Sequence, residues 1–169
     1  MRGMIVNRQI INALSLSRIF FGLLFLYLLV FGFNTVYLVI IFALTVLSDI
    51  LDGYFARKYD LIIDNGSKID VICDFLFIFF STLGIVLVDL APFWFLFVII
   101  FKLIEFFITS GRGALKYDKF GTYVAYMFYA FPIVAILINS KNIILILTVF
   151  ISVCAITSSV LRIKNMSEL

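Results

Sequence analysis

Long runs of apolar residues limit the fold of this chain more than any other feature of its sequence. A run of about 18 apolar residues is long enough to cross the roughly 30 Å hydrocarbon layer of a bilayer as a helix. Of the 169 residues, 64% are hydrophobic and 14% are charged, too few charges to cover a soluble domain. We therefore expect an all-α integral membrane protein with six transmembrane helices, at about 16–33, 35–53, 69–88, 92–110, 121–139 and 142–162.

A short polar segment precedes the first apolar run. Between Asn7 and Ser17, Ser and Asn alternate with Ile and Leu, a pattern that predicts a short N-terminal interfacial helix. No Pro-, Gly- or Ser-rich linker, low-complexity stretch or internal repeat follows it. We therefore expect residues 1–169 to form a single membrane domain.

The basic residues predict the orientation of the chain, because cytoplasmic connections carry an excess of Lys and Arg. Eleven of them fall at the two termini or in the second and fourth connections: Arg2, Arg8, Arg18, Arg57, Lys58, Lys68, Arg112, Lys116, Lys119, Arg162 and Lys164. The opposite connections hold Lys141 alone, and Lys102 lies inside the fourth apolar run. We expect both termini and the polar, functional end of the protein to face the cytoplasm.

The chain contains no histidine. Mechanisms that need an imidazole base or a His-ligated metal are thereby excluded. Any chemistry depends on carboxylates, Lys, Arg, Tyr or hydroxyl groups.

Acidic residues concentrate around the second connection. Asp49 and Asp52 are three apart near the end of the second apolar run, and Asp70 and Asp74 are four apart at the start of the third. These spacings place each pair on one helix face. Two antiparallel helices joined by a short loop therefore direct four carboxylates into one space.

Four ionised carboxylates at this depth need cations, because each costs roughly 2.5–3.5 kcal/mol on insertion scales. Oxygen-only ligands favour a hard divalent ion, magnesium or manganese, and four carboxylates are enough for two ions. Paired ions suit displacement at phosphorus. The alternative, helix capping in a solvated loop, is the better interpretation for Asp60 and Asp64 but not for the four aligned residues.

Small and basic residues surround these carboxylates: Gly53, Ala56, Arg57 and Gly66. Glycine permits close approach of a ligand, and Arg is a bidentate phosphate partner. The string Asp49-x2-Asp52-Gly53-x2-Ala56-Arg57-x8-Gly66-x3-Asp70-x3-Asp74 resembles, at all eight specified positions, the signature of the CDP-alcohol phosphotransferases. The upstream run from Asn12 to Arg18 is similar to that family's Asn-x-Leu-Thr-x-x-Arg motif, with Ser15 in place of Thr.

The resemblance implies a role for each matching residue. Asp49, Asp52, Asp70 and Asp74 would be metal ligands, and Asp74 would also be the base that takes the proton of the acceptor hydroxyl. The pocket for the CDP-linked donor would be lined by Gly53, Ala56, Arg57, Asn12, Ser15 and Gly66. The activated hydroxyl would attack the phosphorus that carries the lipid alcohol, and CMP would leave.

The acceptor alcohol is less constrained by the sequence. Arg112 and Lys116 follow the fourth apolar run and are suited to a phosphate on the acceptor, although positive-inside decoration explains them as well. Lys102 and Glu105 form an intramembrane pair, either neutralising each other or lining a polar cavity. A loose likeness to phosphatidylglycerophosphate synthases favours glycerol 3-phosphate, while inositol phosphate and serine stay open.

Two other functions compete with this one: an aspartate-rich membrane prenyltransferase and a non-enzymatic membrane transporter. The single compound Asp motif argues against the first, and the nearly pure hydrocarbon of the outer half argues against the second. The partners we expect are a CDP-linked lipid such as CDP-diacylglycerol, a small alcohol and membrane lipids, with no nucleic acid. Association of two copies as a homodimer is left open.

Overall fold

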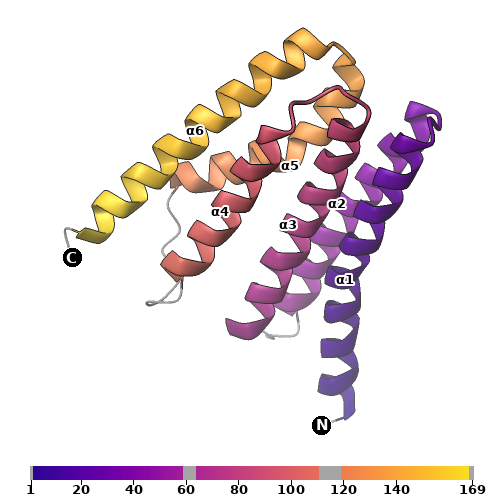
Figure 1. Ribbon diagram of the computed structural model, residues 1–169. Coiled ribbons are helices and arrows are strands. Elements are labelled where there is room, and N and C mark those ends of the chain that lie inside the picture. Colours follow the sequence, from indigo (N-terminus) through magenta and orange to yellow (C-terminus); the bar gives the residue numbers. More distant parts are fainter. Residues whose placement is uncertain (1, 59–63, 111–118, 168–169) are drawn as a thin grey trace. The chain divides into compact units, whose positions relative to one another are not determined.

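The computed structural model describes residues 2–58, 64–110 and 119–167, and the side chains within 13–54, 70–108 and 120–163. Six helices make up the described residues (Figure 1): α1 (Arg2–Val30), α2 (Thr35–Lys58), α3 (Asp64–Leu87), α4 (Trp94–Ser110), α5 (Lys119–Ile138) and α6 (Lys141–Ser167). No strand occurs among them. The expected all-α class is confirmed.

Five of these helices are long and apolar enough to cross a membrane, all except α4. The α4 helix has 17 residues, and residues 111–118 after it lie outside the described part of the chain. The polar segment before the first apolar run is helical, as expected, and forms the first part of α1, which is continuous over 29 residues. That this part of α1 lies at the membrane interface stays a prediction.

The distribution of side chains is the reverse of that in a soluble protein. Large apolar side chains such as Phe20, Ile50 and Ile146 are more than half exposed, whereas Arg18, Lys102 and Glu105 are buried. Several hydroxyls in the apolar helices bond to a carbonyl of their own helix, as Thr45 Oγ1 donates to the carbonyl of Ile41 and Ser81 Oγ to that of Phe77. Exposed apolar faces and internally satisfied polar groups are what a lipid environment requires. The protein is therefore a multi-pass integral membrane protein.

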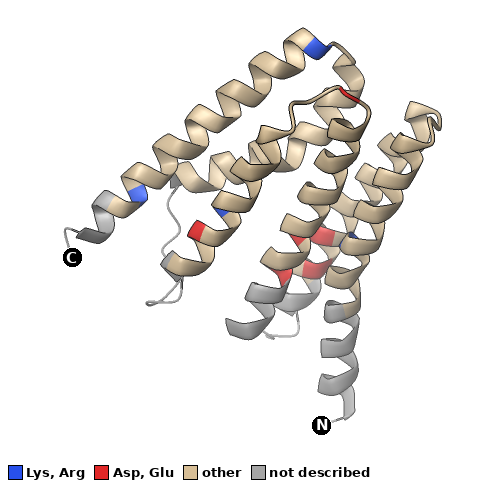
Figure 2. Cartoon of the chain, in the orientation of Figure 1, with Lys and Arg blue, Asp and Glu red and all other residues tan. Residues whose placement is uncertain are grey.

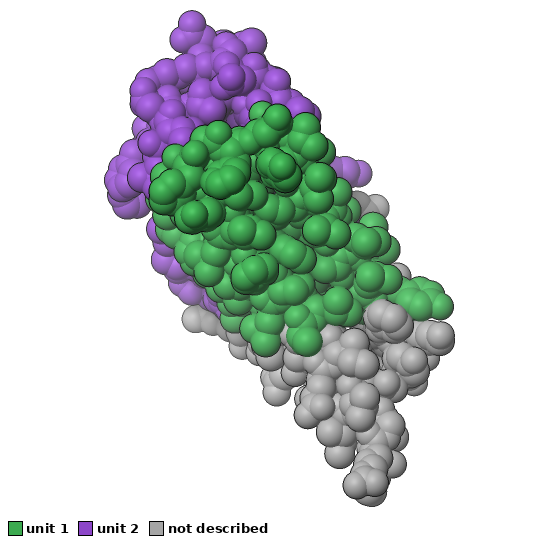
Figure 3. Space-filling view, turned by 90° about the vertical axis from the view of Figure 1, so that its right-hand side faces the viewer, with its two compact units in different colours: residues 1–84 green, residues 85–169 purple. Residues whose placement is uncertain are grey.

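The chain divides into two compact units, residues 1–84 and 85–169 (Figure 3), and each is described by itself. In the second unit α6 packs against both α4 and α5. Phe95 of α4 contacts the Phe128 and Phe131 rings of α5, with ring centroids 5.8 and 4.8 Å apart. That the whole chain is a single domain stays a prediction.

In the first unit a tight turn pairs α1 with α2. Gly32 has a left-handed backbone (φ 71°), and the Phe33 amide donates to the Leu28 carbonyl, the arrangement that commonly ends a helix at glycine. Asn34 then caps α2 through its side chain, which accepts from the Val36 amide at 3.0 Å. The short turn makes the helices antiparallel neighbours, so Ser15 and Asp52 lie about equally far from it.

Glycine allows α3 to approach α1 closely. A Cβ added at Gly22 would lie 3.1 Å from the Cα of Phe77, and one added at Gly84 would lie 3.3 Å from the Cα of Leu26. The Phe77 ring is fully buried and packs edge-on against Phe25, with the two ring centroids 6.3 Å apart. Gly22 and Gly84 therefore set the distance between α1 and α3. The same distance separates the polar groups that these two helices carry toward their N-terminal ends.

Candidate metal and phosphate site

Acidic residues gather in the C-terminal half of α2 and the N-terminal half of α3 (Figure 2). Asp52 and Asp70 each lie about two helical turns from the 59–63 connection, Asp49 one turn further along α2 and Asp74 one turn further along α3. The two helices thus direct their carboxylates into one space at the same end of the unit. This is the convergence that the sequence spacing predicts.

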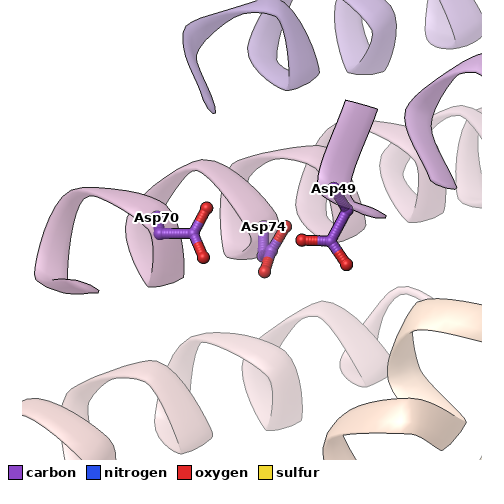
Figure 4. A group of neighbouring side chains, drawn as sticks. All are labelled: Asp49, Asp70 and Asp74. Carbon is purple, nitrogen blue, oxygen red and sulfur yellow. The ribbon is translucent and has the colours of Figure 1, made fainter. Parts of the chain in front are cut away.

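Three of the four carboxylates come within reach of a single ion. One oxygen from each of Asp49, Asp70 and Asp74 lies within 4.8 Å of the other two (Figure 4). All three are accessible, with side-chain exposures of 48%, 38% and 30%. A ligand arriving from outside the helices can reach them.

Asp52 is the buried member of the set, with 7% of its side chain exposed. Its Oδ2 accepts a hydrogen bond from Ser15 Oγ at 2.6 Å and another from Arg18 at 2.9 Å. Its Oδ1 is buried without a hydrogen-bond partner. A buried carboxylate oxygen without a partner is costly, and a cation would satisfy it.

Arg18 of α1 lies among all four carboxylates and is fully buried. Its Nη2 is 3.3 Å from Asp49, 2.9 Å from Asp52 and 2.6 Å from Asp70, and its Nη1 is 2.5 Å from Asp74. The sequence interpretation missed this role, because it counted Arg18 among the residues that mark the cytoplasmic side. Two features of the sequence could have indicated this role. Four intramembrane carboxylates need a cation, and Arg18 ends the Asn12–Arg18 segment that resembles a family motif.

The arrangement fits hard divalent cations. The donor set is oxygen only, as magnesium and manganese prefer. Four carboxylates face one guanidinium among the described side chains, which leaves an excess of negative charge inside apolar helices. Together with the unpaired Oδ1 of Asp52, this excess shows that the residues present suit added positive charge.

The remaining predicted site residues are placed only in part. Gly53 follows Asp52 in α2 and is partly exposed. Four others lie on described helices, but their side chains are outside the described set: Asn12, Ala56, Arg57 and Gly66. Arg112 and Lys116 lie outside the described residues altogether. Their roles stay predictions, as does a role for Ser15 in the donor pocket.

Lys102 and Glu105 form a buried cluster in the second unit, between α4 and α6. Lys102 Nζ lies 2.6 Å from Glu105 Oε2, and Ser159 Oγ of α6 donates to the same oxygen at 2.7 Å. Lys102 Nζ also donates to Ser159 at 3.2 Å. The pair therefore neutralises itself and ties α4 to α6, while a role toward the acceptor alcohol stays a prediction.

A family profile matches the chain along most of its length. The profile of the CDP-alcohol phosphatidyltransferase family matches residues 8–154, which include every carboxylate described above. The chain belongs to this family. Membership removes the basis for the prenyltransferase and transporter hypotheses.

One curated relative is the CDP-diacylglycerol--glycerol-3-phosphate 3-phosphatidyltransferase of Bacillus subtilis (strain 168). It is 37% identical to this chain over 76 residues, a stretch that covers 45% of this chain and 38% of the relative. The match thus spans well under half of the relative's length. No solved structure matches the chain.

The Lys102–Glu105 pair yields a prediction about stability. Lys102→Met should lower the free energy of unfolding by about 3–5 kcal/mol, because it leaves a buried carboxylate without its cation. The double variant Lys102→Met/Glu105→Leu should recover most of this loss, since both charges are then gone. Unfolding of the purified protein in detergent measures both effects.

Lys141 provides the matched control. It pairs with Asp89, and both side chains are mostly exposed, at 59% and 85%. Lys141→Met should therefore change the unfolding free energy by no more than about 1 kcal/mol. A double variant at 102 and 105 that is at least as unstable as the single Lys102 variant would contradict the account of the buried pair.

Proposed function

We propose that this chain transfers a phosphatidyl group from a CDP-linked lipid, CDP-diacylglycerol, to the hydroxyl of a small alcohol in phospholipid biosynthesis. The observation that carries the proposal is the convergence of Asp49, Asp70 and Asp74 within 4.8 Å, inside a segment that matches the family. The acceptor we propose is glycerol 3-phosphate. The activity printed in the name of the Bacillus subtilis relative supports this choice.

Asp49, Asp70 and Asp74 would hold a magnesium or manganese ion, and the free Oδ1 of Asp52 supports a role for that residue in a second ion site. Bound divalent metal would neutralise the diphosphate of the donor and stabilise the attacking and leaving oxygens. The α2 and α3 helices supply these ligands from rigid positions. Burial strengthens the charge interaction between Arg18 and Asp52, which are 0% and 7% exposed.

Asp74 is the residue we assign as general base. A carboxylate oxygen of Asp74 takes the proton of the acceptor hydroxyl, whose oxygen forms a bond to the phosphorus that carries diacylglycerol. The bond from this phosphorus to the bridging oxygen of the diphosphate breaks, and CMP leaves with that oxygen. Gly53, Ala56 and Arg57, together with Asn12, Ser15 and Gly66, would line the donor pocket.

The phosphate of the acceptor needs a cation of its own. Arg112 and Lys116 are the residues we assign to it, because charge-assisted hydrogen bonds to phosphate are strong. An acceptor without phosphate, such as serine, would depend instead on Lys102 and Glu105. Inositol phosphate, like glycerol 3-phosphate, would engage the two basic residues.

We place the carboxylate site and both termini on the cytoplasmic side. The eleven basic residues of the termini and of the second and fourth connections support this orientation. Lys141 is the one basic residue in the connections that we place on the opposite side of the membrane. Within the second unit it forms an exposed ion pair with Asp89. A homodimer stays an open part of the proposal.

Purified protein incubated with labelled CDP-diacylglycerol and an acceptor tests the function. With glycerol 3-phosphate and magnesium or manganese we expect phosphatidylglycerophosphate and an equal amount of CMP, and we expect chelation to abolish both. Serine and inositol phosphate, offered in parallel, report a different acceptor. Full turnover of chelator-treated, metal-free protein would contradict the metal mechanism, and no CMP with any acceptor would contradict the function.

The assignment of Asp74 as base predicts a split between turnover and donor binding. Asp74→Asn should lower kcat by about 10²–10⁴-fold, because it removes the proton acceptor. The affinity for the CDP-linked donor should fall less in Asp74→Asn than in Asp49→Asn, because we assign Asp49 only to metal binding. Asp89→Asn is the control, since Asn tolerates the positive φ of Asp89 and this residue lies far along the chain from the site. Near-normal turnover of the Asp74 variant would move the base elsewhere.

A further inference from the structure

The buried guanidinium of Arg18 is the cation that the described side chains place against all four carboxylates. We propose that Arg18 is a positioning residue, a built-in counterion that holds the carboxylates together while no metal is bound. This inference rests on the proposed function, in which the same carboxylates bind divalent metal. It assigns to Arg18 the assembly of the site rather than contact with the reacting atoms.

The position of Arg18 supports this role. Its side chain is fully buried, whereas the side chains of Asp49, Asp70 and Asp74 are 48%, 38% and 30% exposed. Arg18 therefore approaches the carboxylates from the interior of the helices and leaves their accessible side open. Its closest contacts use one oxygen of each carboxylate, Oδ2 of Asp52 and Oδ1 of the other three. A second oxygen on each residue remains for an incoming ion.

Charge gives the physical reason. Four carboxylates held this close inside apolar helices repel one another, and a buried ion pair that loses one partner is strongly destabilised. Only a planar, forked cation reaches several carboxylates at once from one position. The Nε of Arg18 is buried without a hydrogen-bond partner, which indicates that the carboxylates, contacted through Nη1 and Nη2, determine where the guanidinium lies.

The packing of the three helices leads to the same conclusion. Arg18 lies one helical turn before Gly22, the residue that lets α1 approach α3 closely. Ser15, one turn before Arg18, donates to Asp52 at 2.6 Å. Ser15 and Arg18, on consecutive turns of α1, thus form a polar face that contacts α2 and α3. Arg18 is the charged residue of this face.

The test compares thermal unfolding of the full chain in detergent, with chelator and with Mn²⁺. In chelator, Arg18→Gln should lower the midpoint by roughly 5–10 °C, because the four carboxylates lose their counterion. Mn²⁺ should restore most of this loss, so that the metal stabilises the variant more than it stabilises the unsubstituted protein. Arg18→Lys, which keeps the charge but not the fork, should fall between the two.

Arg162→Gln is the matched control, since Arg162 belongs to the second unit, where its guanidinium carbon lies 5.5 Å from the centroid of the Phe106 ring. Its response to Mn²⁺ should equal that of the unsubstituted protein. A midpoint for Arg18→Gln that is unchanged, or lowered equally in chelator and in Mn²⁺, overturns the inference, because a purely packing role predicts no rescue by metal. If Arg18→Gln cannot be purified, Arg18→Lys takes its place. The inference is then overturned if Mn²⁺ raises the unfolding midpoint of Arg18→Lys by no more than it raises that of the unsubstituted protein.

Electron paramagnetic resonance of free Mn²⁺ separates this inference from the proposed function. Loss of the free-ion signal on adding unsubstituted protein is the expected result. If the unsubstituted protein binds no Mn²⁺, the proposed metal site fails and the inference fails with it. If it binds Mn²⁺ but Arg18→Gln shows no selective rescue, the inference fails alone.

Discussion

The contact of one buried guanidinium with four carboxylates is the interaction on which the first unit of this protein depends. Each carboxylate would be costly at membrane depth on its own, and four together would repel. Arg18 offsets part of this cost at distances between 2.5 and 3.3 Å. The negative charge that remains explains how an apolar helix bundle can hold a site suited to divalent cations.

The rest of the first unit brings these groups together. The tight turn at Gly32 and the Asn34 cap make α1 and α2 antiparallel neighbours, and Gly22 admits the backbone of α3. Because lipid offers no hydrogen bonds, every remaining polar group must be satisfied within the helices. The second unit meets the same requirement differently, with Lys102 and Glu105 neutralising each other and bonding to Ser159. In the same lipid environment, one unit thus holds an accessible, charged site and the other holds a buried pair whose charges neutralise each other.

Much of this arrangement can be predicted from the sequence. Apolar runs locate the helices, and spacings of three and four place Asp49, Asp52, Asp70 and Asp74 on facing helix sides, because helical periodicity alone determines both. The position of Arg18 could not be predicted in this way, since it depends on the register of α1 against two other helices. The polar segment before the first apolar run is helical as predicted, and it continues without a break into the rest of α1. The distinction between three clustered carboxylates and a buried Asp52 likewise arises only from packing.

We have proposed that the carboxylates of α2 and α3, arranged by Arg18, form one metal-binding cage. Anomalous X-ray scattering from crystals of the unsubstituted protein grown with Mn²⁺ is the direct test of this cage. We expect an anomalous peak bonded to Asp49, Asp70 and Asp74, with the guanidinium of Arg18 on the buried side of the same carboxylates. Anomalous peaks confined to other acidic residues, with none among these three aspartates, would contradict it.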